Sequence, residues 1–104
     1  MTLLSYSSLK NADVSLRAAV LIGDLAKVKS LIEEGADINA KDASGNTPLY
    51  YAIQQRNEDI AELLIAKGAD VNAKNKSGQT ALDIAIDQDH TGIVELLRKH
   101  GAKE

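Results

Sequence analysis

Cysteine, tryptophan and phenylalanine are absent from this chain of 104 residues, which has three tyrosines and one proline. Without cysteine the protein can form no disulfide, no thiolate nucleophile and no zinc site built on cysteine. Aromatic side chains are too few to stack the bases of a single-stranded nucleic acid. The lack of cysteine fits a reducing compartment, so we expect a cytoplasmic protein.

Long apolar runs and a strong charge of one sign are also missing. No segment approaches the ~18 consecutive apolar residues that a membrane helix needs. The start of the chain, MTLL, has neither the basic nor the apolar region of a secretory signal. The net charge is −3, and the basic residues form no contiguous run, whereas a nucleic-acid surface needs clustered positive charge. We therefore expect no membrane and no nucleic acid among the partners.

Signals of catalysis and metal binding are absent as well. The two histidines, His90 and His100, have no second ligand at a metal-binding spacing. No G-x-S-x-G motif, glycine-rich phosphate loop or pair of carboxylates suited to acid–base chemistry occurs. We expect no enzymatic activity, no cofactor and no metal.

The chain does contain a repeat with a period of 33 residues. When residues 42–71 are compared with residues 75–104, 13 of the 30 positions are identical, and residues 16–41 match the same pattern. A fixed period between about 20 and 50 residues is typical of stacked-repeat architectures.

The run Gly45-Asn46-Thr47-Pro48-Leu49, the pair Leu63-Leu64 and the segment 68–73 (GADVNA) resemble an ankyrin repeat. The resemblance recurs three times and implies an all-α solenoid of stacked helix-turn-helix repeats joined by β-hairpin loops. Tyr50 stands where the family usually has the histidine of its Thr-Pro-Leu-His turn, and Arg17 and Asp83 replace it in the other repeats. The start of each first helix must therefore be held in another way.

We divide the chain into a capping segment or tail (1–12) and three repeats (13–41, 42–74 and 75–104). Residues 1–12 carry Leu3, Leu4, Tyr6 and Leu9, which a cap could lay on repeat one; a frayed tail is the alternative. In repeat three, Arg98 and Lys99 stand where repeat two has Ile65 and Ala66. Because an uncovered last repeat needs a polar face, we expect a complete three-repeat unit.

Several local elements follow from the pattern. Asp13 and Thr47 are expected to cap first helices, with Pro48 at the first helical position. Ala85 and Ile86 are expected inside, and an extended strand pair is expected around residues 75–78, with glycine ending the turn.

Leu21 and Ile22 are apolar where the other repeats have polar residues. We favour the interpretation that the N-terminal segment covers them, because the end of a solenoid must hide its face. The alternative is an exposed apolar patch that binds a partner.

The resemblance implies a partner-binding concave face, made by the hairpin tips and the exposed side of each inner helix. Tyr50 is expected near this face and Tyr51 between repeats; the alternative is that both are structural. The residues predicted to bind a partner are Lys41, Asp42, Ala43, Ser44, Asn46, Tyr50, Gln54, Gln55, Lys74, Asn75, Lys76, Ser77, Gln79, Asp87 and Gln88, and we call this set the concave face.

We therefore predict a monomeric protein–protein interaction module that acts as an adaptor or inhibitor of another protein of unknown identity. The alternative is a designed or reconstructed repeat scaffold without a partner. An enzyme is the third and least favoured class, because no catalytic constellation is present and a fold alone does not assign chemistry.

Overall fold

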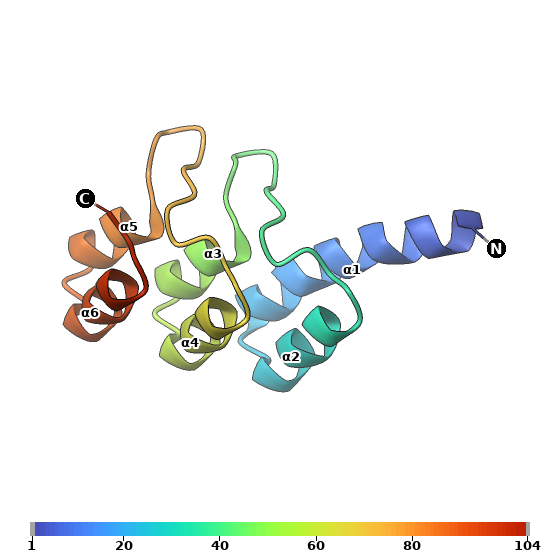
Figure 1. Ribbon diagram of the computed structural model, residues 1–104, viewed down its shortest axis with the longest axis horizontal. Coiled ribbons are helices and arrows are strands. Elements are labelled where there is room, and N and C mark those ends of the chain that lie inside the picture. Colours follow the sequence, from blue (N-terminus) through green and yellow to red (C-terminus); the bar gives the residue numbers. More distant parts are fainter. Residues whose placement is uncertain (1, 104) are drawn as a thin grey trace.

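The computed structural model describes residues 2–103, with side chains from residue 12 onward, as two layers of helices (Figure 1). One layer contains α1, α3 and α5, and the other contains α2, α4 and α6. The bounds are α1 Thr2–Ile22, α2 Leu25–Glu33, α3 Pro48–Gln54, α4 Glu58–Ala66, α5 Ala81–Asp87 and α6 Thr91–Lys99. The molecule measures 46 × 27 × 22 Å. No helix in the described part of the chain is long and apolar enough to span a membrane.

The core runs as a ribbon between the two layers and continues from repeat to repeat. Leu49, Ile53, Ile60 and Leu64 are almost completely buried. The equivalent positions of the other repeats, Leu16, Val20, Leu31, Leu82, Ile93 and Leu97, are also buried. Apolar side chains at equivalent positions are thus buried in all three repeats, with one exception in the last repeat.

That exception is Ile86, which was expected inside but is 44% exposed. Its equivalents, Val20 and Ile53, are fully buried because the following repeat packs on them. Within the described residues no repeat follows α5 and α6, so the side chain of Ile86 lies open.

Threonine caps hold the starts of α3 and α5, where Tyr50 and Asp83 replace the histidine of the family's Thr-Pro-Leu-His turn. Thr47 caps α3 as predicted, accepting a hydrogen bond from the Tyr50 amide, and Pro48 follows at the first position. At α5 the cap is reciprocal: the Thr80 hydroxyl accepts from the Asp83 amide at 3.2 Å, and the Asp83 carboxylate accepts from the Thr80 amide at 2.9 Å. Such a capping box satisfies two amides that the helix leaves unbonded.

Asp13 does not cap a helix, so that prediction is wrong. α1 runs without a break from Thr2 to Ile22, since no proline or glycine interrupts it and each residue added to a formed helix gains one hydrogen bond. The Asp13 carboxylate instead accepts a hydrogen bond from the Asp37 amide at 2.6 Å. The expected cap involves the side chains of Leu3, Leu4, Tyr6 and Leu9, which lie outside the part of the chain whose side chains the structure describes.

The strand pair expected around residues 75–78 is also wrong, because the described residues contain no strand there. Asn75 closes the loop with its side chain and its backbone. Its Oδ1 atom accepts from the amides of Ser77 and Gln79 at 2.9 and 3.0 Å, and its amide donates to the Gln79 carbonyl at 3.0 Å. The predicted turn is present, with the Gly78 amide bonded to the Asn75 carbonyl and Gly78 at φ 76°.

The capping box predicts a measurable cost. We expect Thr80→Ala to lower the free energy of unfolding by about 1 kcal/mol, because an N-cap hydroxyl is lost. Urea unfolding followed by circular dichroism measures this, with Thr91→Ala, at an exposed first position of α6, as the control. Equal effects of the two changes would contradict the role of the cap.

Candidate functional site

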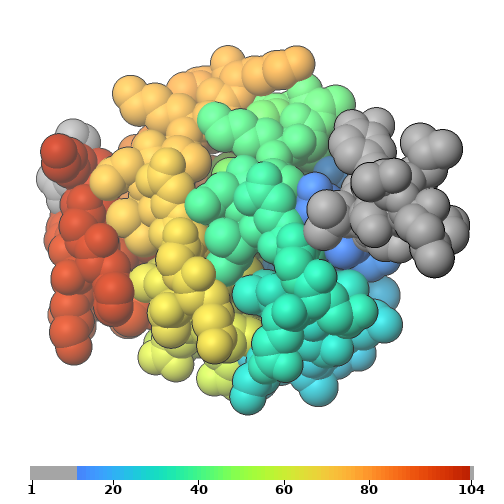
Figure 2. Space-filling model, turned by 45° about the vertical axis from the view of Figure 1, so that its right-hand side comes forward, coloured from blue at the N-terminus to red at the C-terminus, as the bar shows by residue number. Residues whose placement is uncertain are grey.

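The loops of repeats two and three stand side by side (Figures 1 and 2) and are bonded to each other. The Lys76 amide donates to the Ser44 carbonyl at 3.0 Å. The Lys41 ammonium donates to the Lys74 carbonyl at 2.9 Å, and Asn75 Nδ2 donates to Asn46 Oδ1 at 2.9 Å. These bonds fix the position of one tip relative to the other.

Gly45 makes this close approach feasible. Its φ is 78°, and a Cβ atom added there would lie 2.9 Å from the Lys76 nitrogen and 3.2 Å from the Asn75 Cα atom. Gly78, the equivalent residue, has φ 76° but nothing within 4 Å of such an atom. The two glycines thus share a backbone requirement, and only Gly45 is needed for loop-to-loop contact.

Asp42 organises the loop of repeat two. One carboxylate oxygen accepts from the amides of Ser44 and Asn46, both at 3.0 Å. The other oxygen accepts from the Tyr51 hydroxyl, whose oxygen accepts in turn from Asn46 Nδ2 at 3.3 Å. Tyr51 packs against the core, so this network ties the loop tip to the repeat body.

The network shifts the pKa of both ionisable groups. Burial raises the pKa of Asp42, but the hydrogen bonds from Tyr51, Asn46 and Ser44, with the charge of Arg17, outweigh it and leave the pKa below 3.8. The hydrogen bond to Asp42 raises the pKa of Tyr51 above 10.0, with smaller contributions from burial and the carboxylate charge. Asp42 is therefore held ionised and Tyr51 neutral at physiological pH.

The two adjacent tyrosines have different surroundings, as expected. Their rings meet edge to face, with centroids 5.7 Å apart and planes at 88°. Tyr51 packs on the core, whereas Tyr50 is half-buried and lines a small hollow at the base of both loops, beside Asn46 and Gln79. A role for Tyr50 in binding stays a prediction.

A second joint lies at the C-terminal ends of the inner helices. Gln88 Nε2 donates to the Gln54 carbonyl at 3.0 Å, and the Arg56 guanidinium donates to the Gln88 carbonyl at 3.0 Å. The Oε1 atom of Gln88 is buried and accepts no hydrogen bond in the described part of the chain. Sequence reasoning misses this link between repeats, because Gly23 and Asp89 stand at the positions equivalent to Arg56.

Leu21 and Ile22 lie at the same end of α1, and the interpretation that the N-terminal segment covers them is wrong. They are 42% and 80% exposed. Residues 2–11 belong to the same continuous helix. A helix rises about 1.5 Å per residue, so even the nearest of them, residue 11, lies roughly 15 Å along the helix axis from Leu21. The exposed apolar patch is what remains of the two alternatives.

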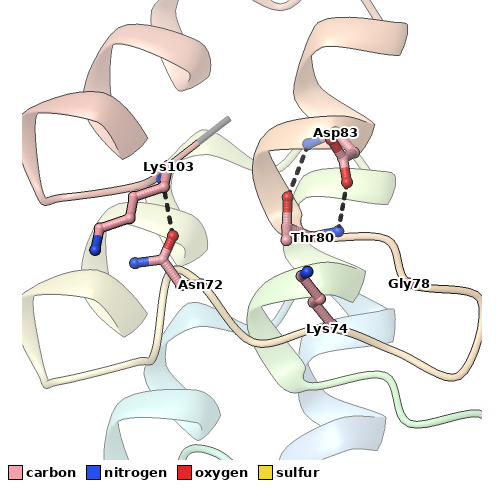
Figure 3. Close-up of a pocket in the computed structure, with 6 residues that line it drawn as sticks. All are labelled: Asn72, Lys74, Gly78, Thr80, Asp83 and Lys103. Carbon is pink, nitrogen blue, oxygen red and sulfur yellow. Dashed lines mark hydrogen bonds between the residues drawn. The ribbon is translucent and has the colours of Figure 1, made fainter.

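An open hollow of about 370 Å³ lies between the loop of repeat three and the C-terminal segment (Figure 3). Its lining includes Lys74 and Lys103, and the Asp83 carboxylate that caps α5. Asn72 Oδ1 accepts from the Lys103 amide at 2.8 Å, just as Asn39 Oδ1 accepts from the Asp70 amide one repeat earlier. The predicted set omitted Asn72 and Lys103, although the 33-residue spacing of the two asparagines marks this joint.

Apart from Tyr50, the concave-face residues divide into two groups. Asp42, Asn46, Asn75 and Gln88 are half-buried, and their side chains hydrogen-bond within the chain, so they hold the shape of the face. The exposed members are Lys41, Ala43, Ser44, Gln54, Gln55, Lys74, Lys76, Ser77, Gln79 and Asp87. No group of three or more potential metal ligands occurs among the residues described.

Stacked helix pairs with interlocked loops define a helical-repeat solenoid. A sequence model described as "Ankyrin repeats (3 copies)" matches residues 16–104. The chain belongs to the ankyrin-repeat family, whose repeats are typically non-catalytic modules that bind other proteins.

Three relatives illustrate the range of proteins that contain similar repeats. The chain is 49% identical over 53 residues to the mouse 2-5A-dependent ribonuclease, a match that covers 50% of the chain and 7% of the relative. It is 46% identical over 50 residues to human protein phosphatase 1 regulatory subunit 27, covering 48% and 32%. It is 39% identical over 71 residues to the Drosophila melanogaster NF-kappa-B inhibitor cactus, covering 59% and 14%. The chain thus spans less than a third of each relative.

The loop contact predicts different costs at the two glycines. Gly78→Ala should lower the free energy of unfolding by about 1–2 kcal/mol, the cost of a left-handed residue that has a Cβ atom. Gly45→Ala should cost at least ~1 kcal/mol more, because backbone of the neighbouring loop must shift. Chemical denaturation of both variants measures the difference, and equal losses would show that the loops are not in contact.

The Asp42–Tyr51 hydrogen bond predicts a pH-dependent stability. Tyr51→Phe should lower the free energy of unfolding by about 1–2 kcal/mol at pH 7, since a bond to a charged group is lost. Because the folded pKa of Asp42 is lowered, its contribution is present above about pH 4 and disappears as the pH falls through the folded pKa. The difference between native protein and variant should therefore shrink in acid.

The raised pKa of Tyr51 acts at the other end of the scale. Its contribution is present below pH 10 and is lost as the pH rises through the folded pKa. Urea unfolding between pH 2 and 11 measures both limits. Tyr50→Phe is the matched control, because its hydroxyl makes no hydrogen bond to a described residue; a pH-independent loss in Tyr51→Phe would refute the network.

Proposed function

We propose that this protein binds another protein through the concave face and acts as an adaptor or inhibitor. The observation that supports this most is the set of hydrogen bonds between the loops, from Lys76 to Ser44, from Lys41 to Lys74 and from Asn75 to Asn46. They hold exposed side chains of two repeats in one arrangement before any partner arrives. Binding then costs little ordering of loops.

The size of the surface suits a stable complex. A standard protein–protein interface buries about 800 Å² on each side, which we expect three repeats to supply. The half-buried residues of the face would keep its shape, and the exposed lysine, glutamine and aspartate side chains would make the contacts.

The relatives support the class of function and not a particular partner. Two of them are named as an inhibitor and as a regulatory subunit, which are roles exerted on other proteins. The ribonuclease is matched over only 7% of its length, so its activity is not carried over. We further propose a cytoplasmic monomer, in keeping with the absence of cysteine.

A capture experiment tests the proposal. Native protein is used as bait in lysate of the source cells, beside a variant with Gln54→Lys, Gln55→Lys and Asp87→Lys, all at exposed concave-face positions. We expect mass spectrometry to find a protein that the native bait retains and the variant loses.

The control variant carries Glu33→Lys and Glu95→Lys, which lie exposed on the outer helices α2 and α6. Two glutamine changes add one charge each and the aspartate change adds two, while each glutamate change adds two, so both variants gain the same net charge. A partner lost equally by both would move the site off the concave face. Capture of nothing by any bait would favour a scaffold without a standing partner.

A further inference from the structure

The 33-residue period places equivalent side chains of α1, α3 and α5 in rows. One row lies at the C-terminal ends of these helices and consists of Leu21, Gln54 and Asp87, which we call the helix-end row. All three side chains are exposed. The helices neighbour each other in the order α1, α3, α5 (Figure 1), so the row crosses the face from repeat one to repeat three.

The row begins with an apolar end. Leu21 is 42% exposed, and Ile22 beside it is 80% exposed. Ile22 borders an open hollow of about 400 Å³, which Ser15 and Ala18 and the charged residues Asp24 and Lys27 also line. A partner side chain that covers this apolar surface would stabilise the complex by about 25 cal/mol per Å² of apolar surface removed from water.

The middle of the row is polar and neutral. Gln54 and Gln55 are exposed amides, which can donate to and accept from the backbone of a bound segment. Arg56, of the same repeat, donates to the Gln88 carbonyl. Because this acceptor is neutral, the guanidinium keeps its positive charge beside the row.

The row ends with an acidic side chain. The Asp87 carboxylate is exposed and makes no hydrogen bond or ion pair to a described residue. Asp89, two residues on, adds negative charge, although it shares a hollow with Arg98. The lysines Lys74 and Lys103 line the hollow beside Asp83, at the opposite, N-terminal end of α5.

We infer that the partner presents a segment with an apolar side chain for Leu21 and Ile22 and a lysine or arginine for Asp87. The inference rests on the proposed function and adds its chemistry. Axes of packed helices lie about 8–10 Å apart. Because α3 lies between α1 and α5, Leu21 and Asp87 are separated by roughly 16–20 Å. In an extended chain, at about 3.3 Å per residue, that is five or six residues.

Charge complementarity favours such a segment over a second copy of the chain. Two copies that met through Leu21 and Ile22 would bury a patch of two side chains, far below the roughly 1,000 Å² that a specific interface needs. A basic apolar segment uses both ends of the row at once.

Selection from a phage-displayed library of random 16-residue peptides, with the full chain immobilised, tests the inference. Peptides that native protein enriches should share an apolar residue and a lysine or arginine at a fixed spacing. Asp87→Lys should select aspartate or glutamate in place of the basic residue. Leu21→Ser should lose the apolar preference.

Two control variants match these changes. Leu25 is 42% exposed, as Leu21 is, but lies on the outer helix α2, so Leu25→Ser should leave the selected peptides unchanged. Glu62→Lys makes the same charge reversal at an exposed position of the outer helix α4. For the best peptide, fluorescence anisotropy should show about three- to tenfold weaker binding to Asp87→Lys, since an attraction becomes a repulsion, and no change for Glu62→Lys.

The outcomes separate this inference from the proposed function. If Gln54→Lys and Gln55→Lys abolish peptide binding but the selected peptides show no charge preference that depends on Asp87, the inference is overturned and binding at the concave face still stands. Peptides that depend on Leu25 or Glu62 would overturn both. Light scattering tests whether the chain associates with itself. Self-association that Leu21→Ser abolishes would assign the apolar end to a second copy and overturn the inference.

Discussion

Each repeat of this protein buries its apolar side chains against the next repeat, because helices of seven and nine residues have no interior of their own. Leu49, Ile53, Ile60 and Leu64 are buried through this stacking. Where the described residues provide no following repeat, as at Ile86, the equivalent side chain lies open. Burial therefore depends on the neighbour and not on the residue type.

Stacking also accounts for the hydrogen bonds that join one repeat to the next along the loops. The bonds from the Asp70 amide to Asn39 and from the Lys103 amide to Asn72 join residues 31 apart, and the bond from the Lys41 ammonium to the Lys74 carbonyl joins residues 33 apart. Each satisfies a group of one repeat with a group of the next. Any change that loosens the stack would also loosen the concave face, so the stability of the fold and the shape of this face depend on the same contacts.

The repeat pattern was sufficient to predict the positions that stacking fixes. Thr47 and Pro48 start α3 as expected, because a cap and a proline at the first position act within one turn of helix. Most of the apolar stripe was predictable for a similar reason, since period and burial are linked. The predicted face residues came from family resemblance, and their geometry separates shape-holding from exposed members.

The predictions that failed concern places where the repeat is interrupted. Asp13 stands where a repeat begins, which favours a helix cap, but propagation of the preceding helix overrides this weak start signal. Leu21 and Ile22 were expected to be covered, and the continuous α1 carries the N-terminal segment away from them. The expected strand pair gave way to a loop that Asn75 closes with its own side chain.

The binding row inferred above consists of positions whose side chains differ between repeats. Stacking positions carry similar side chains in each repeat because each meets the same neighbour. Leu21, Gln54 and Asp87 meet solvent and carry three different chemistries. A repeated fold with identical outer rows would bind the same feature at every step and could not set the direction of a partner. A row that changes from apolar to acidic distinguishes its two ends, and so can fix both the register and the direction of a bound chain.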